Sequence, residues 1–197
     1  MLPEYFIFIG TGINAIGAIS YLIDTVRGRV QPNRVTWFLW ALAPLVTVAA
    51  QLDQGVGLPA LLTFSVGFLP ALIVIASFFN KKAVWKITRF DIFCGVLSLV
   101  GLILWQITKV GNIAILLSIV ADLFAGIPTF RKAYSHPDSE SFRAFFLGAI
   151  GAVLVILTIT TWTFAVAAFS VYFFLSNSLI AFLVKSRIGA RSRHQIQ

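Results

Sequence analysis

Apolar residues follow one another in seven long stretches along the chain, separated by short polar segments. The stretches cover roughly residues 5–25, 36–52, 60–79, 92–108, 113–130, 144–161 and 163–184. Most have close to the roughly 20 residues that an α-helix needs to cross about 30 Å of hydrocarbon. They lack the strict alternation of β-strands, and several carry glycines at helix-packing spacing. The pattern predicts an all-α, seven-transmembrane-helix bundle.

The composition agrees with a location in a bilayer. Hydrophobic residues make up 59% of the 197 residues and charged residues only 11%, which is outside the range of soluble globular domains. The uncharged run from Ala144 to Val184 is too long for one span, so we expect a turn near Thr160–Thr163. The first stretch lacks a basic leader and holds Asn14 at its middle, so we expect a retained span rather than a signal peptide.

The basic residues indicate an orientation. Of the 15 Lys and Arg residues, 14 lie in the first, third and fifth loops and in the tail, and only Lys109 lies on the other side. By the positive-inside rule, the amino terminus is expected outside and the carboxy terminus in the cytoplasm, in a plasma or inner membrane. The basic residues that give the net charge of +8 are therefore expected to contact anionic lipid headgroups rather than nucleic acid.

A weak internal repeat aligns the chain with itself at an offset of 105 residues. Segment 64–68 (Phe-Ser-Val-Gly-Phe) falls on segment 169–173 (Phe-Ser-Val-Tyr-Phe), and the same register places Pro32 on Pro137. A linking span between two three-helix copies makes the copies parallel. The predicted organisation is 3+1+3: a first repeat at 1–80, a loop and linker helix at 81–112, a second repeat at 113–185 and a basic cytoplasmic tail at 186–197.

The chain resembles the SWEET and PQ-loop superfamily of seven-helix small-solute transporters. Segment 127–132 (Ile-Pro-Thr-Phe-Arg-Lys), followed by Ser-Glu-Ser at 139–141, keeps the proline and the basic residue of the family motif and has Thr in place of Gln. The first copy has Ile23-Asp24 at the matching position and keeps neither feature. The resemblance implies transport of a small solute, with prolines that act as hinges.

Asp122 and Asn14 are the first candidates for a solute site. Asp122 is expected about 14 Å below the outer surface, near the midplane, and Asn14 lies at nearly the same depth in its own span. A carboxyl there costs about 2.5 to 3.5 kcal/mol on insertion scales, so it must face protein or a water-filled cavity. We expect Asp122 to carry protons or to pair with a cationic group of the solute. Structural hydrogen bonds between helices are the alternative for both residues.

Three further kinds of residue are candidates. Asn177 is similar to the pocket asparagine of SWEET proteins, which implies a substrate-binding role, although a packing contact also explains it. Pro44 and Pro128 are expected inside spans, where each acts as a hinge or as a fixed kink. Trp40 either stacks on the solute or closes a gate, or it belongs with Trp37 to the aromatic belt.

The sequence lacks several motifs that are typical of metal sites and enzymes, and this narrows the functions that we expect. His136 and His194 lie in expected cytoplasmic segments, so no intramembrane metal site is predicted. Asp138 and Glu140, beside His136, are interpreted as a solvated polar turn. No phosphate-binding loop and no pair of nucleophile and base is present in the spans. We therefore expect neither an enzyme nor a bound cofactor.

The sequence thus favours a secondary transporter or facilitator for a small polar solute, sugar-like or amino-acid-like, in which Asp122 is the candidate for proton coupling. A non-transporting seven-helix receptor of the same fold is the alternative. The expected partners are the solute, protons and membrane lipids, and a homo-oligomer is compatible with the pattern.

Overall fold

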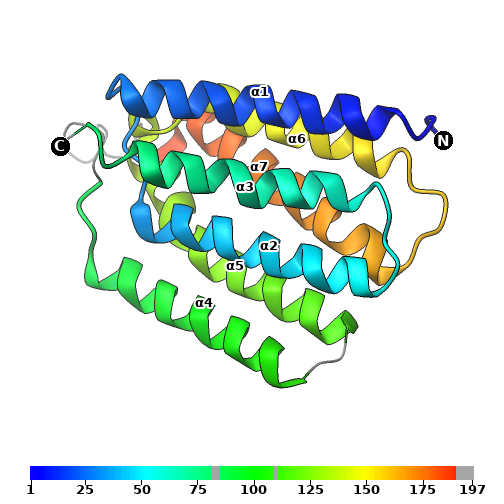
Figure 1. Cartoon of the computed structure of the whole chain (residues 1–197). Coiled ribbons are helices and arrows are strands. Elements are labelled where there is room, and N and C mark those ends of the chain that lie inside the picture. The colour runs from blue at the N-terminus through cyan, green and yellow to red at the C-terminus, as the bar shows by residue number, and fades with distance from the viewer. Residues whose placement is uncertain (81–84, 109–110, 190–197) are drawn as a thin grey trace.

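The computed structural model describes residues 1–80, 85–108 and 111–189. Within these ranges the regular structure is helical, with seven α-helices and one short 3₁₀-helix (Figure 1). Their bounds are α1 Phe6–Val26, α2 Arg34–Asp53, α3 Ala60–Ala76, α4 Arg89–Thr108, α5 Gly111–Ser135, η1 Pro137–Ser139, α6 Phe142–Ile156 and α7 Phe164–Ser186. Each apolar stretch forms one α-helix, so the prediction of an all-α fold is confirmed.

Four of the described helices, α1, α2, α5 and α7, are long and apolar enough to cross a membrane. Helices α3 and α6 are also apolar but have only 17 and 15 residues. Large hydrophobic side chains are exposed along the whole bundle, which is expected where lipid rather than water surrounds the helices. These features indicate a membrane protein.

The connection between α6 and α7 is rich in threonine, and α6 ends at Ile156, earlier than the stretch 144–161 predicts. The Thr158 hydroxyl donates to the carbonyl oxygen of Val155 at 2.7 Å, and the Thr163 side chain accepts from the N–H of Val166 at 3.4 Å as the cap of α7. Threonine hydroxyls that bond to nearby backbone compete with the helical pattern. The turn predicted near Thr160–Thr163 is confirmed.

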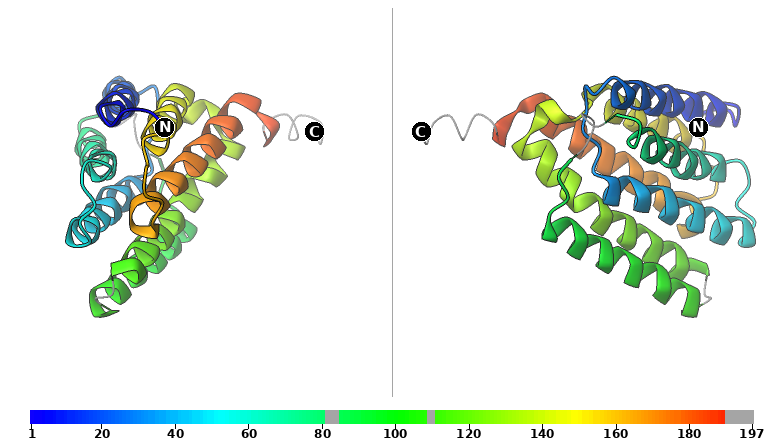
Figure 2. Two further views of the ribbon diagram at one scale, coloured as in Figure 1. Left: turned by 90° about the vertical axis from the view of Figure 1, so that its right-hand side faces the viewer. Right: turned by 60° about the vertical axis from the view of Figure 1, so that its left-hand side comes forward.

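The helices form two layers, with α4 at one edge. In the end-on view of Figure 2 (left), α1, α3 and α2 lie in one layer and α6, α7 and α5 in the other. Within each layer the third helix packs in the middle, so α3 contacts α1 and α2, and α7 contacts α5 and α6. The layers meet closely along α1–α6 and α2–α5, whereas α3 and α7 touch only slightly. Helix α4 packs on α5 and α2.

Small residues bring α1 and α6 together. The buried stripe of α1 includes Gly10, Asn14 and Gly17, spaced at three and four residues so that they share one face. A Cβ atom at Gly10 would lie 2.6 Å from the carbonyl oxygen of Gly151 on α6, so the two backbones approach more closely than a side chain permits. This close approach fixes the position of Asn14 against α6.

Candidate functional site

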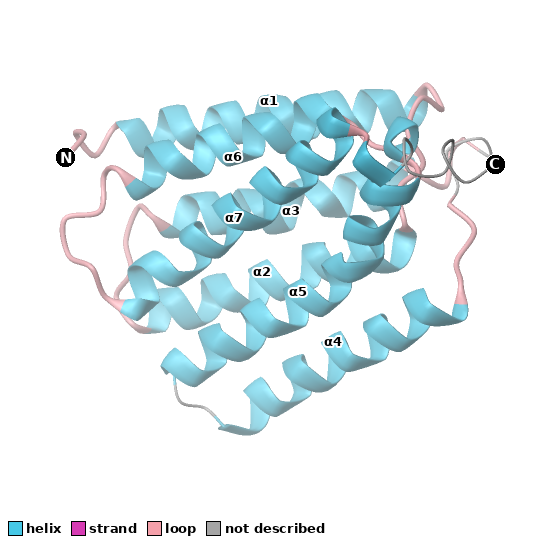
Figure 3. Ribbon diagram, turned by 180° about the vertical axis from the view of Figure 1, so that it is seen from behind, coloured by secondary structure: helices cyan, strands magenta, loops and turns pink. Residues whose placement is uncertain are grey.

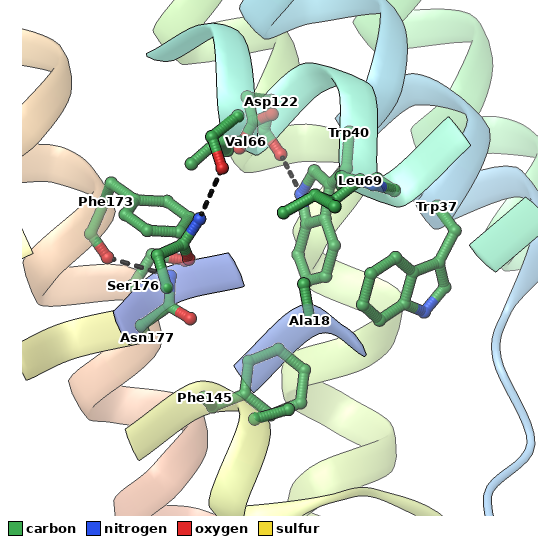
Figure 4. Close-up of a pocket in the computed structure, with 14 residues that line it drawn as sticks. Ala18, Trp37, Trp40, Val66, Leu69, Asp122, Phe145, Phe173, Ser176 and Asn177 are labelled. Atoms are coloured by element: carbon green, nitrogen blue, oxygen red, sulfur yellow. Dashed lines mark hydrogen bonds between the residues drawn. The ribbon is translucent and has the colours of Figure 1, made fainter. Parts of the chain in front are cut away.

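A small cavity lies between the two layers. Its volume is about 60 Å³, room for a few water molecules. Helices α1, α2, α3, α5, α6 and α7 all contribute to its wall, and none of the described side chains of α4 does. The residues that line this central cavity (Figure 4) are Asn14, Ala18, Trp37, Trp40, Ser65, Val66, Leu69, Pro70, Asp122, Ala144, Phe145, Phe173, Ser176 and Asn177.

Asp122 reaches the central cavity from α5 and is only 5% exposed. The Tyr172 hydroxyl of α7 donates to its Oδ2 at 2.6 Å, whereas its Oδ1 is buried and has no hydrogen-bond partner among the described residues. The indole Nε1 of Trp40 donates to the backbone carbonyl oxygen of Asp122 at 3.2 Å. Burying a carboxyl oxygen without a hydrogen-bond donor destabilises the protein. A proton, a cation or a hydrogen-bond donor that enters the cavity and binds this oxygen would therefore lower the free energy.

Two amides complete the polar part of the wall. Asn14 donates from Nδ2 to the Ser65 hydroxyl on α3 at 3.1 Å, and Asn177 donates from Nδ2 to the carbonyl oxygen of Phe173, one turn earlier on α7, at 3.0 Å. Gly148 of α6 lies between them, because a Cβ atom there would be 2.7 Å from the Asn177 Oδ1 and 3.5 Å from the Asn14 Oδ1. Both amide oxygens therefore lie beside Gly148 on α6.

Aromatic rings close the other side of the cavity. Figure 4 shows Trp37, Trp40 and Phe145 across from Asn177. The Trp37 and Trp40 ring centroids are 5.4 Å apart, and Phe145 lies 6.3 Å from Trp40. Tyr21 extends the cluster, with its ring 4.4 Å from that of Trp37. Trp37 is 5% exposed, so the prediction that it belongs to the aromatic belt is wrong.

A buried ion pair lies beyond this aromatic cluster. Lys132 at the end of α5 has its Nζ 2.7 Å from the Glu140 Oε1, and their side chains are 1% and 0% exposed. The Tyr21 hydroxyl donates to the Glu140 Oε2 at 2.9 Å, and Lys132 also donates to the carbonyl oxygen of Gln31. The Lys132 Nζ lies 4.9 Å from the ring centroid of Trp85. This ion pair therefore ties the segment after α5 to α1 and to the loop before α2.

The interpretation of segment 136–140 as a solvated polar turn is wrong for Glu140 and correct for Asp138. Asp138 is exposed and pairs with Arg187 at the end of α7. Glu140 is buried because η1 directs the chain back against the bundle, where Tyr21 of α1 donates a hydrogen bond and Lys132 of α5 forms an ion pair.

The structure brings the predicted residues Asn14, Asp122, Asn177 and Trp40 to one cavity. Pro44 and Pro128 are buried inside the continuous helices α2 and α5 and do not line it. Pro70 of α3 does line it. The roles assigned to these residues stay predictions.

The site includes Tyr172, Ser65 and Phe145, which the sequence analysis above does not assign to it. A signal existed for Phe145, because the offset of 105 residues pairs it with Trp40. No pattern indicated Tyr172, which aligns with Gly67 in the first copy. Its partner Asp122 aligns with Gly17, so the hydrogen bond between them has no counterpart in the first copy.

The described part of the chain has no group of three or more His, Cys, Asp or Glu residues placed to hold a metal ion. In comparisons with protein-family models, curated proteins and solved structures, none matches the chain. The candidate site is therefore interpreted from its own geometry.

Proposed function

We propose that the chain is a secondary transporter or facilitator that moves a small polar solute across a membrane by alternating access. The observation that carries the proposal is the central cavity, which six helices wall and which gathers Asn14, Asp122 and Asn177. Polar and ionisable groups inside a membrane are costly and commonly mark a substrate or ion pathway. A polar solute that binds these groups would offset their cost.

The proposed architecture is two parallel three-helix repeats, α1–α3 and α5–α7, joined by α4. The contacts between helices support it. A twofold rotation would exchange α1 with α5, α2 with α6 and α3 with α7. It would therefore convert the contact between α1 and α6 into the contact between α5 and α2, and the structure contains both contacts. In addition, α3 begins at Ala60 and α7 at Phe164, an offset of 104 residues that is close to the 105 found in the sequence. The cavity would then lie on the axis that relates the repeats.

In this proposal the solute binds to acceptor oxygens of three residues that line the cavity. Asp122 Oδ1 lacks a donor among the described residues, and the amide oxygens of Asn14 and Asn177 lie near Gly148. Hydroxyl and ammonium groups of a solute are suitable donors for all three. The faces of Trp40 and Phe145 would supply apolar contact for the carbon skeleton of the solute.

Alternating access requires one end of the cavity to be closed while the other is open. The aromatic cluster of Tyr21, Trp37, Trp40 and Phe145, with the Lys132–Glu140 ion pair beyond it, is the proposed barrier on the cytoplasmic side. This barrier joins residues of both repeats, so relative motion of the repeats would open it. Proton coupling is assigned to Asp122, whose carboxyl faces the cavity.

The test begins with a panel of sugars, amino acids, amines and carboxylates, each screened for thermal stabilisation of the purified protein. A stabilising solute is then measured by counterflow into proteoliposomes. Saturable counterflow that requires the protein supports the proposal. Specific binding without counterflow contradicts it and favours the alternative, a non-transporting receptor.

A further inference from the structure

A second hollow lies on the outer face of the bundle, between α6 and α7, which run side by side in Figure 3. This α6–α7 groove has a volume of about 440 Å³. Small residues, Ala149, Ser178 and Ala181, lie among the larger side chains that line it. The groove is lined by Phe142, Phe146, Ala149, Ile150, Val153, Leu154, Phe174, Ser178, Ala181, Phe182 and Lys185.

The groove has a positive charge at one end only. Lys185, in the last turn of α7, lines it, and its Nζ lies 5.4 Å from the ring centroid of Phe142 at the start of α6. Arg143, the next residue on α6, is also exposed. Neither cation has a carboxylate partner among the described residues, whereas Lys132 pairs with Glu140 and Arg187 with Asp138. This end of the groove is therefore suited to an anion.

The length of the groove matches one leaflet of a bilayer. From Phe142 to Leu154 it follows α6 for a rise of roughly 18 Å at 1.5 Å per residue. Half of a hydrocarbon core of about 30 Å is close to this length. An acyl chain whose headgroup lies beside Lys185 would extend along the groove to about the bilayer midplane.

We propose that the α6–α7 groove is a binding site for one anionic glycerophospholipid. The headgroup phosphate pairs with Lys185 and Arg143, and one acyl chain packs along Ala149, Ser178 and Ala181. The site is separate from the central cavity, and the proposal does not depend on transport. Each cation near the membrane surface is expected to favour an anionic over a zwitterionic headgroup by about fivefold in affinity.

The test measures the thermal unfolding of the purified full chain in detergent as phosphatidylglycerol or phosphatidylcholine with the same acyl chains is added. Phosphatidylglycerol should stabilise the protein at lower concentration than phosphatidylcholine. Lys185→Gln should reduce this preference by about fivefold. Arg131→Gln is the matched control and should retain it, because Arg131 is another exposed cation, 5.3 Å from the Phe90 ring centroid and outside the groove.

A second pair of variants tests the acyl chain. Ser178→Phe fills the groove and should weaken stabilisation by both lipids, while Leu179→Phe places the same ring on the exposed side of α7 and should not. Equal stabilisation by the two lipids, or an equal preference in Lys185→Gln and Arg131→Gln, would overturn the proposal. A disulfide-linked dimer formed through Ser178→Cys would also overturn it, because a second copy would then occupy the groove. If Ser178→Phe does not fold, the lysine and arginine variants decide alone.

Discussion

The Tyr172 hydroxyl donates a 2.6 Å hydrogen bond to the Asp122 Oδ2, and this bond joins α7 to α5 at the central cavity. It holds the carboxyl in one orientation, in which Oδ1 is buried without a partner among the described residues. In the proposed transporter, Tyr172 therefore orients Asp122, and the solute or a proton occupies the free oxygen. The backbone of Asp122 is held separately by the indole of Trp40.

Replacing Tyr172 by Phe removes the donor and keeps the ring. Loss of a hydrogen bond to a buried carboxyl costs about 1 to 3 kcal/mol, so we expect the KM for solute counterflow to rise by roughly tenfold, with the protein still folded. The measurement is concentration-dependent counterflow in proteoliposomes. Tyr134→Phe, at an exposed tyrosine near the end of α5, is the control and should leave the KM unchanged. An unchanged KM in Tyr172→Phe would exclude the orienting role.

Glu140→Gln leaves the Lys132 charge buried without its carboxylate. Removing one partner of a buried ion pair typically costs about 3 to 5 kcal/mol, so we expect a large decrease in Tm in detergent. Asp138→Asn, which breaks the exposed pair with Arg187, should cost only about 0 to 1 kcal/mol. Lys132→Met combined with Glu140→Leu should recover part of the loss. Equal Tm values for Glu140→Gln and Asp138→Asn would contradict the expected cost of leaving Lys132 buried without its carboxylate.

Two glycines on α1 offer a matched comparison. Gly10→Ala places a Cβ atom 2.6 Å from the backbone of Gly151, so α1 and α6 must separate, at a cost of about 1 to 3 kcal/mol. A Cβ atom at Gly12 has no neighbour within 4 Å, so Gly12→Ala should be neutral or stabilising by up to about 1 kcal/mol. Thermal unfolding of both variants measures the difference. If Gly10→Ala is as stable as Gly12→Ala, the close packing of α1 on α6 is not required.

The sequence predicts the helices and much of the site for physical reasons. Long apolar runs permit little besides helices, and an acid or amide inside such a run must avoid lipid, so Asp122, Asn14 and Asn177 point inward together. Lys132 was different. The apolar pattern places it among the loop cations, yet α5 continues to Ser135, beyond the predicted end at residue 130, and Lys132 is buried.

Contacts between residues distant in sequence could not be predicted. The bonds from Tyr172 to Asp122 and from Asn14 to Ser65 depend on how the helices rotate about their axes. That rotation follows from packing, such as the approach of Gly10 to Gly151, and hydrophobic periodicity alone does not determine it. The burial of Glu140 likewise depends on η1, a turn of only three residues.

The most direct test of the account compares solute counterflow for Asp122→Asn and Asp53→Asn at several values of pH, with equal protein in the proteoliposomes. Asp53 ends α2 and is exposed, so its variant removes a carboxylate outside the central cavity. We expect Asp122→Asn to transport at least tenfold more slowly, by an order-of-magnitude estimate, and to lose the dependence of the rate on pH, because an amide has one acceptor oxygen fewer and does not ionise. Asp53→Asn should match the wild type. A wild-type rate and pH dependence in Asp122→Asn would exclude Asp122 from solute binding and proton coupling.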